Sequence, residues 1–430
     1  MQTTRRLTSP RPLVTDPEIP GAALVLCVDA LTTWLGEALG QPCTIAIRRV
    51  RHEQGAGVAL AFDLTTVTDG RRVTRPCVAR AYAHRSRADL KALLGMLPAD
   101  EALAVDLGRR IVVTGAAGDR TLPLLPRLFG LEGGERVLGR AMPEHSCTGT
   151  AAVRTVRHDP GRRWLGVLDH GDGAPLALRA YRSSRHLDRA TAAYDAFLGT
   201  EVKVPAILGT SRALAFAAVG WVDGHRLDGS SKTDDWTAAG VALAKLHACA
   251  ASRLTEAGLE DETATLARAA RRIAALLPDS ASEAELLADL LSRLLERIPR
   301  DRVPLHGALT PDRVVLDTNG TVTFVDLDSA RFGPSATDVG SLVAATLVAA
   351  EDADMAPRAH REIEALLDGY RTVRRTPDPF AVGLHAAASR LRTVLDPFVA
   401  GSSEWRAQAG RRLQGVRTAL DDMALVGSGR

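Results

Sequence analysis

The sequence predicts an α+β protein with two lobes, and two observations support this class. Segments with strand-like alternation lie mainly before residue 222, and amphipathic helical segments dominate the remainder. Runs of strands followed by runs of helices are typical of α+β folds. The 430 residues, of which 46% are hydrophobic, are enough for one large bilobal unit or for two to three domains with packed cores.

Charge and cysteine content argue against several classes of protein. The net charge of +3 is nearly balanced, and the arginines are scattered rather than arranged along one face, so we expect no nucleic-acid partner. The five cysteines are dispersed and lack C-x-x-C spacing, as expected of free thiols in a reducing cytoplasm rather than of a zinc site. The chain starts without the apolar core of a signal peptide, and no apolar run is long enough to span a membrane. We therefore expect a cytoplasmic protein without a membrane partner.

The N-terminal third predicts a leader and a small α+β domain. Residues 1–20 are rich in Pro and Thr and predict a loose leader, and the domain is expected over 21–145. Its expected elements are a helix over 22–39, strands over 45–85 with a turn at Asp69-Gly70, a helix over 88–96 and further short strands up to about residue 143.

The middle of the chain repeats two short patterns of this N-terminal domain. The segment from Val50 to Gly55, VRHEQG, is mirrored by VRHDPG from Val156 to Gly161, and ARAY ending at Tyr82 is mirrored by LRAY ending at Tyr181. Both pairs are offset by about 100 residues, the scale of a whole domain. Either the N-terminal domain duplicates the small lobe that follows it, or two sheets share strand-and-turn patterns by convergence.

The rest of the chain predicts a small lobe over 146–222 and a helical large lobe over 223–425. In the small lobe we expect a helix over 186–198 and strands over 204–206 and 215–221. The large lobe is expected to contain helices over 236–251, 254–277, 282–297, 340–351, 358–374, 378–395 and 403–422.

Candidate functional residues concentrate between residues 304 and 340. A loop opens at His306-Gly307, and Pro311 prevents a helix there. Two short apolar strands, at 314–316 and 322–325, flank the turn Asp317-Thr318-Asn319-Gly320, whose Asn-Gly pair suits a hairpin. Asp326 and Asp328 follow the second strand, and carboxylates at such a position suit a divalent cation that carries phosphates.

This stretch resembles the catalytic core of the aminoglycoside phosphotransferase and choline kinase-like family, distant relatives of protein kinases. The family pattern is His-Gly-Asp, four residues and Asn, then a hairpin and an Asp-x-Asp metal site. Here the first pattern stands as His306-Gly307-Ala308 with Arg313 at the Asn position, and the second as Asp326-Leu327-Asp328. The segment 334–340 is similar to the Pro-Ala-x-Asp-Leu-Gly of the family. The resemblance covers roughly residues 148–425 and implies a kinase-like fold, with an antiparallel small lobe, a mostly helical large lobe and an extra N-terminal α+β domain.

The resemblance also implies roles for individual residues. Asp326, with Asp328 as helper, would hold Mg²⁺, and His306 would belong to the catalytic loop. Ala308 stands at the position of the catalytic base and Arg313 at that of a metal-binding amide. Arg313 is also a candidate cofactor-binding residue, because its guanidinium could bind the nucleotide phosphates directly in place of a metal ion.

Further nucleotide-binding residues are expected in the small lobe. Arg179 stands where the family has a phosphate-binding Lys, Asp188 is a candidate partner for it, and Trp221 lies in a segment similar to the hinge between lobes. Arg179 could equally be an ordinary strand arginine facing water. For His247 we favour a structural role in the core.

The departures at Ala308, Arg313 and Arg179 favour a kinase-fold protein with degraded phosphotransfer chemistry. Ala308 cannot accept a proton, Arg313 brings a positive charge to the metal site, and Arg179 replaces the phosphate-binding Lys. We interpret the protein as a pseudokinase that acts by binding a nucleotide, a substrate or a partner, with ATP and Mg²⁺ as candidate cofactors. One alternative is an active ATP-dependent phosphotransferase acting on a hydroxyl of a small molecule or of a peptide Ser or Thr, with Asp312 or Asp328 orienting the acceptor. The other is a scaffold whose N-terminal third is a docking module.

Overall fold

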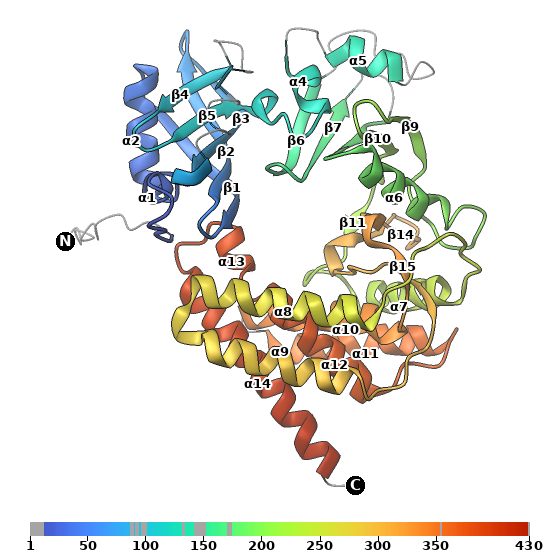
Figure 1. The fold of residues 1–430 in the computed structure, drawn as a ribbon. Coiled ribbons are helices and arrows are strands. Elements are labelled where there is room, and N and C mark those ends of the chain that lie inside the picture. The colour runs from blue at the N-terminus through green and yellow to red at the C-terminus, as the bar shows by residue number, and fades with distance from the viewer. Residues whose placement is uncertain are drawn as a thin grey trace, which may run out of the picture. The chain divides into compact units, whose positions relative to one another are not determined.

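The computed structural model describes residues 13–86, 90, 94–95, 101–130, 134–141, 152–169, 174–352 and 355–428. The chain forms two compact units (Figure 1). The first comprises Met1–Leu187, Leu208–Val219 and Asp396–Trp405, and the second comprises Asp188–Ile207, Gly220–Leu395 and Arg406–Arg430.

The first unit contains an N-terminal antiparallel sheet with the strand order β1-β2-β3-β5-β4. Its strands are β1 (Cys43–Glu53), β2 (Gly57–Thr68), β3 (Arg71–Tyr82), β4 (Ala102–Asp106) and β5 (Ile111–Gly115). Two helices, α1 (Ala22–Val25) and α2 (Val28–Leu39), precede it and contact β1 and β2. The single helix expected over 22–39 is interrupted because Cys27 adopts an extended conformation.

A second antiparallel sheet in the same unit has the order β6-β7-β8-β10-β9. Its strands are β6 (Ala152–Asp159), β7 (Arg163–Asp169), β8 (Leu176–Tyr181), β9 (Ile207–Ser211) and β10 (Phe216–Gly220). Helices α4 (Leu124–Leu128) and α5 (Gly134–Ala141) precede it, and a core that includes Trp164 and Phe216 joins α4 to the sheet. Helix α6 (Ser184–Asp195) follows β8.

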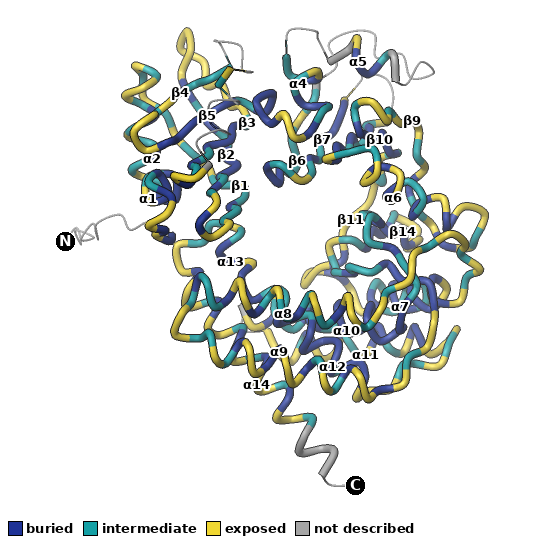
Figure 2. The backbone as a smooth tube through the Cα atoms, in the orientation of Figure 1, coloured by how far each residue is buried: buried dark blue, intermediate teal, exposed yellow. Residues whose placement is uncertain are grey.

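The two sheets share more than their strand order. In each sheet, the strand that comes last in the sequence lies fourth in the strand order; this strand is β5 in the first sheet and β10 in the second. Both strands are buried apart from their final glycine (Figure 2). The residue before this strand, Arg110 or Ala215, adopts a positive φ, although neither is a glycine. Its carbonyl accepts a hydrogen bond from the backbone N–H of Tyr82 (3.2 Å) or of Tyr181 (2.8 Å). The same local geometry therefore closes both sheets.

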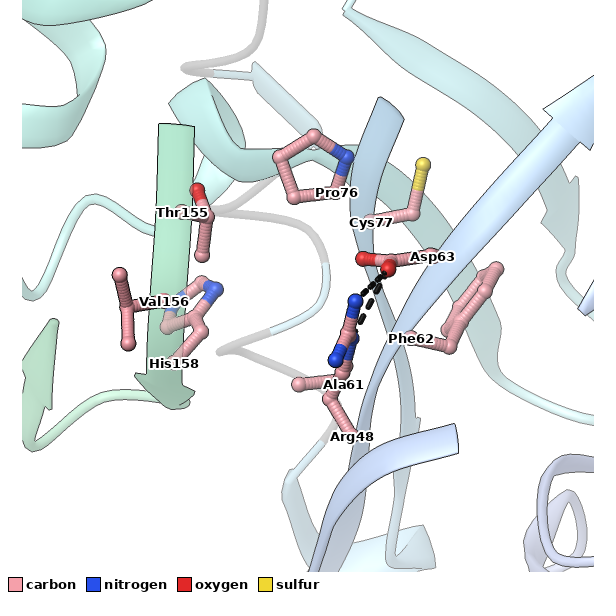
Figure 3. A pocket seen from close by; sticks show the side chains of 9 residues that line it. All are labelled: Arg48, Ala61, Phe62, Asp63, Pro76, Cys77, Thr155, Val156 and His158. Atoms are coloured by element: carbon pink, nitrogen blue, oxygen red, sulfur yellow. Dashed lines mark hydrogen bonds and ion pairs between the residues drawn. The ribbon is translucent and has the colours of Figure 1, made fainter. Parts of the chain in front are cut away.

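The sheets face each other across a cavity of about 10 Å³, the lower limit for one water molecule. Figure 3 shows Arg48 paired with Asp63 on the first sheet, opposite Thr155 and His158 of β6. Arg48 Nε donates to Asp63 at 2.8 Å. The space is too small for an organic ligand, so this cavity is a packing feature of the contact between the sheets.

Residues 13–19, expected within a loose leader, are packed into the first unit. Leu13, Val14 and Ile19 are buried. The indole nitrogen of Trp405 donates to the Leu13 carbonyl at 2.9 Å, so the segment Asp396–Trp405 contacts this N-terminal stretch.

The second unit is mainly helical. Its helices are α7 (Thr233–Ala248), α8 (Leu259–Leu276), α9 (Ala281–Leu295), α10 (Ser335–Asp352), α11 (Ala356–Arg371), α12 (Pro379–Thr393) and α14 (Trp405–Ser428, almost all in this unit). Helix pairs α7/α11, α8/α9 and α10/α12 pack against each other (Figure 1). The helix expected from residue 254 begins at Leu259, because Thr255 and Ala257 instead hydrogen bond to the backbone of Phe332. No helix in the described residues has the length and apolarity needed to cross a membrane.

Candidate functional site

The candidate site in the second unit lies between two short strand pairs. Strand β12 (Val303–Leu305) pairs with β15 (Arg331–Gly333), and β13 (Val314–Leu316) pairs with β14 (Val322–Phe324). The predicted hairpin is present, with Leu316 opposite Val322. The Asp317 side chain closes its turn by accepting from the N–H groups of Asn319 and Thr321, both at 2.8 Å. The loop from His306 to Arg313 therefore starts and ends on strands that fix its position.

The start of this loop is anchored by Asp338 of α10. Its carboxylate accepts from the N–H of His306 at 2.6 Å and from the N–H of Gly307 at 2.9 Å. His247 of α7 lies 3.4 Å from the same carboxylate and 2.8 Å from the hydroxyl of Tyr370. Burial acts to raise the pKa of Asp338, but the hydrogen bond and charge of His247 hold that pKa below its usual value. Asp338 therefore remains an anion that fixes the loop, and His247 supports it from the core.

His306 is buried, and its ring forms a hydrogen bond that fixes the position of the loop. Its Nε2 lies 2.9 Å from the Val325 carbonyl, just past β14. Burial lowers the pKa of His306, so the neutral ring donates this bond. The next residue, Gly307, has φ +79°, and a Cβ there would lie 2.1 Å from the Ser329 carbonyl oxygen. Only glycine fits at this point, where the two loops touch.

Arg313 and Ala308, the two positions that depart from the family pattern in this loop, contact each other, and Arg313 also contacts Asp326. One guanidinium nitrogen donates to the Ala308 carbonyl, and another lies 3.1 Å from a carboxylate oxygen of Asp326. Both side chains of the ion pair are more than four-fifths buried. Asp326 adopts a left-handed conformation with φ +64°, which is costly for a residue other than glycine and persists only where the surroundings impose it.

This arrangement does not fit a divalent cation at Asp326. A guanidinium already neutralises the carboxylate, and a cation bound there would have to displace it. Among the described residues, no three or more His, Cys, Asp or Glu side chains gather in a way that could hold a metal ion. The predicted helper, Asp328, lies in the short 3₁₀ turn Leu327–Ser329, and its role remains a prediction.

Other predicted site residues lie on several elements. Arg179 is on β8 in the first unit, with its Nε 3.2 Å from the Tyr181 hydroxyl. Asp188 lies on α6, and Trp221 follows β10 with 37% of its surface exposed. Asp312 is exposed in the candidate loop and accepts from the Thr310 hydroxyl at 2.6 Å. The binding roles of Arg179, Asp188 and Trp221 remain predictions.

Sequence reasoning missed two buried aspartates that hold a loop and a turn through their backbone N–H groups. Asp338 was visible only as part of a family-like segment, and nothing in the sequence indicated its bonds to the His306 loop. Asp119 was not singled out at all, although its buried carboxylate accepts from the Gly161 N–H at 2.8 Å, in the turn between β6 and β7. An Asp-x-x-Leu-Pro segment at Asp119 that parallels Asp-x-x-Ile-Pro at Asp16 was the available signal.

These features define a kinase-like phosphotransferase fold. They are the small antiparallel sheet, the anchored His-Gly loop, the hairpin and the aspartate that follows the hairpin. The chain belongs to the phosphotransferase enzyme family, whose model matches residues 159–375. A search of curated proteins finds no match.

Solved structures support the same fold. A choline/ethanolamine kinase family protein from Mesorhizobium loti is 17% identical with a TM-score of 0.50, covering 67% of this chain and 93% of its own. Choline kinase LicA from Streptococcus pneumoniae is 13% identical with a TM-score of 0.50, covering 67% and 99%. A choline kinase from Cryptosporidium parvum is 13% identical with a TM-score of 0.52, covering 68% and 96%. The predicted family and α+β kinase-like fold are therefore confirmed.

Proposed function

We propose that this protein is a pseudokinase, a kinase-fold protein that has lost phosphotransfer and acts by binding a nucleotide, a substrate or a partner. The observation that supports this proposal is the ion pair between Arg313 and Asp326, beside Ala308. A methyl group in place of the catalytic carboxylate removes general-base assistance, which contributes about 10²–10⁴ in rate. Repulsion between the guanidinium and a divalent cation costs about 4 kcal/mol per unit-charge pair at about 4 Å in a partly polar site.

The proposed ligand is ATP bound without a required metal ion. Guanidinium groups bind phosphate oxygens through paired hydrogen bonds, so arginines can neutralise the phosphates where Mg²⁺ does not fit. Similar structures are named choline kinases. Small molecules with a hydroxyl group are therefore the first class to screen as a second ligand beside ATP. We also propose the cytoplasm as the compartment, since the four described cysteines are free.

The domain organisation is part of this proposal. Residues 21–145 form an extra domain, 146–222 the small lobe and 223–425 the large lobe. The corresponding scaffold hypothesis gives the extra domain a docking role. It would be favoured by a protein partner that binds stoichiometrically and is lost when surface charge is removed from this domain.

Calorimetric titration with ATP, with and without Mg²⁺, tests the binding part. We expect the same dissociation constant in both conditions. The variant Arg313→Asn should create a Mg²⁺ dependence, because it frees the Asp326 carboxylate and supplies an amide oxygen as a second ligand. Strictly Mg²⁺-dependent binding by the unaltered protein would contradict the proposal.

Turnover of ATP tests the chemistry. We expect the unaltered protein and Asp326→Ala to release ADP at the same background rate. The competing hypothesis is a slow phosphotransferase in which the exposed carboxylate of Asp312 orients the acceptor. Mg²⁺-dependent turnover that is lost in both Asp326→Ala and Asp312→Asn would establish that enzyme and overturn the pseudokinase.

A further inference from the structure

The hairpin formed by β2 and β3 extends beyond the rest of the N-terminal sheet. Strand β3 pairs with β2 over its whole length. On its other side, β3 pairs with β5 only from Cys77 to Ala81, because β5 ends at Gly115 and the chain then enters a 3₁₀ turn. No strand within the described residues pairs with residues 71–76 on that side. The first half of β3 is therefore an open strand edge in this part of the structure.

The second sheet has no such extension in the part of the chain that the structure describes. Strands β2 and β3 have 12 residues each, whereas β7 and β8 have 7 and 6. The two hairpins match at the end that carries the tyrosine. There Tyr82 lies opposite Gly57 in the first sheet, and Tyr181 lies opposite Arg163 in the second. The added length of β2 and β3 therefore lies at the turn that joins them, and the strand order shared by the two sheets does not require it.

The extended part of the hairpin is a regular structure. The strands remain paired up to a two-residue turn, in which Asp69 and Gly70 have φ values of +51° and +73°. Two positive φ values are what a tight type I′ hairpin turn requires. The hydroxyls of Thr65 and Thr74 hydrogen bond across the strands at 2.8 Å. The open edge is thus already extended, so a partner strand does not have to order it on binding.

The side chains along the open edge are exposed and basic. Residues 71–75, with the sequence RRVTR, are all exposed, and 46% of the surface of Val73 is exposed. Three of the five side chains are arginines. Within the described residues, no hydrogen bond or ion pair involves the side chain of Arg71, Arg72 or Arg75. The edge therefore carries three cations together with a β-branched apolar side chain.

This charge pattern decides which kind of strand fits the edge. Successive residues of a strand point to opposite faces, so Arg71, Val73 and Arg75 share one face and Arg72 and Thr74 share the other. Two copies of this chain that paired edge to edge would place arginines opposite arginines, and like charges opposite one another destabilise a strand pair. A strand with carboxylates at those positions gains from every such pair instead. The edge is thus protected against its own copy and complementary to an acidic strand.

We propose that residues 71–75 of β3 form a docking edge for an extended acidic segment of a protein partner, which adds a strand to the N-terminal sheet. Main-chain hydrogen bonds hold such a segment, and its side chains select it. In antiparallel pairing, the segment that matches the edge residue by residue is Glu-Thr-Val-Glu-Glu, with its central valine opposite Val73. This inference rests on the proposed function only in giving the scaffold hypothesis a surface, because the edge needs no nucleotide.

Fluorescence anisotropy of the labelled peptide Glu-Thr-Val-Glu-Glu, titrated with the full chain, tests the side-chain contacts. We expect saturable binding. Arg72→Glu and Arg75→Glu should each weaken it about 3- to 10-fold, because an opposite-charge pair becomes a like-charge pair. The matched control is Arg154→Glu, which makes the same charge change at an exposed position on β6, an edge strand of the second sheet, and should leave binding unchanged. Thermal unfolding of each variant checks that the fold is retained.

Two N-methylated peptides test whether the segment binds as a strand. One carries the methyl group on the valine nitrogen and the other on the threonine nitrogen. Successive N–H groups of a strand point to opposite sides, so only one of the two nitrogens faces β3. We expect one methylated peptide to lose binding and the other to retain it. Equal binding by both would mean that charge attraction alone holds the peptide, and the added strand would be wrong.

The remaining outcomes separate the docking edge from other partners and from the proposed function. Equal weakening by Arg154→Glu and Arg72→Glu would overturn the edge as the binding site. A dimer of the chain in light scattering that Arg72→Glu disrupts would assign the edge to a second copy and overturn the acidic partner. If ATP binds but the peptide does not, the docking edge is wrong and the nucleotide-binding pseudokinase stands. If the peptide binds as predicted but ATP does not, the docking edge stands and nucleotide binding is wrong.

Discussion

The first turn of each sheet is held by an aspartate that contacts a histidine ring and a glycine N–H. The two aspartates differ in one further partner, an arginine. In the first sheet Asp16 lies 2.9 Å from His52 Nε2 and accepts from the Gly55 N–H at 3.0 Å. In the second sheet Asp119 makes the equivalent contacts with His158 and Gly161, both at 2.8 Å. Only Asp119 also pairs with an arginine, Arg80. Among the described residues no arginine pairs with Asp16.

This difference shows what the N-terminal sheet contributes. The first turn is supported locally, by Arg85, which donates to the Gly55 carbonyl at 2.8 Å. The second turn is supported from the other sheet, since Arg51 binds Pro160 and Arg49 lies 3.2 Å from the Asp159 carboxylate. The turn between β6 and β7 is therefore held by the N-terminal sheet, and its Gly161 N–H is already bonded to a carboxylate. Three predictions test this comparison.

The largest expected effect follows from removing each aspartate. Asp119→Ala should lower the free energy of unfolding by about 3–5 kcal/mol, because it leaves the arginine of a buried ion pair without its partner. Asp16→Ala should cost about 1–3 kcal/mol, the effect of unsatisfied hydrogen-bonding groups alone. Urea unfolding followed by circular dichroism measures both.

A double variant serves as the control for this pair. Asp119→Ala combined with Arg80→Leu should recover part of the loss, because the uncompensated buried charge is then absent. Equal losses for Asp119→Ala and Asp16→Ala would show that the ion pair with Arg80 adds nothing, and the proposed asymmetry between the sheets would be wrong.

The pH dependence of stability should show the same asymmetry on a smaller scale. Burial acts to raise the pKa of Asp119, but the charge of Arg80 and the hydrogen bond with His158 hold that pKa well below its usual value. The unfolded chain therefore binds the proton first as pH falls. The stabilisation is fully present above the unfolded pKa near 4 and is lost as pH decreases below it.

Unfolding free energies measured between pH 6 and pH 3 check this prediction. Asp119→Asn should flatten the profile below pH 4 more than Asp16→Asn does, since the pKa of Asp16 is also lowered but without an arginine. A profile that Asp119→Asn leaves unchanged would mean that other carboxylates cause the acid sensitivity.

The smallest expected effect concerns the turn glycines and should be alike in both sheets. Gly55 and Gly161 have φ values of +60° and +73°, a region that costs a residue with a Cβ about 1–2 kcal/mol. Gly55→Ala and Gly161→Ala should each lower the unfolding free energy by this amount in the same urea assay. A large difference between them would show that the two turns are not equivalent.

Local elements could be predicted well from the sequence. Strand 314–316 and the turn with Gly320 appear where expected, because adjacent turn residues and alternating apolar residues determine a short hairpin. Helix α9 (Ala281–Leu295) begins and ends within two residues of its prediction, since its apolar stripe repeats at helical spacing. The helix from residue 254 was predicted to start too early, because its first residues pair with Phe332, far along the chain.

By itself, the sequence determined the family, the order of the elements and the unusual residues Ala308 and Arg313, because these depend on residue types at fixed spacing. Only the tertiary structure decided that Arg313 contacts both the Ala308 carbonyl and Asp326. Likewise, only the tertiary structure showed that arginines of the N-terminal sheet bind the turn of the second sheet. Such partners are separated by many residues along the chain. A sequence pattern does not specify the direction in which a long, flexible arginine side chain extends once the backbone has folded.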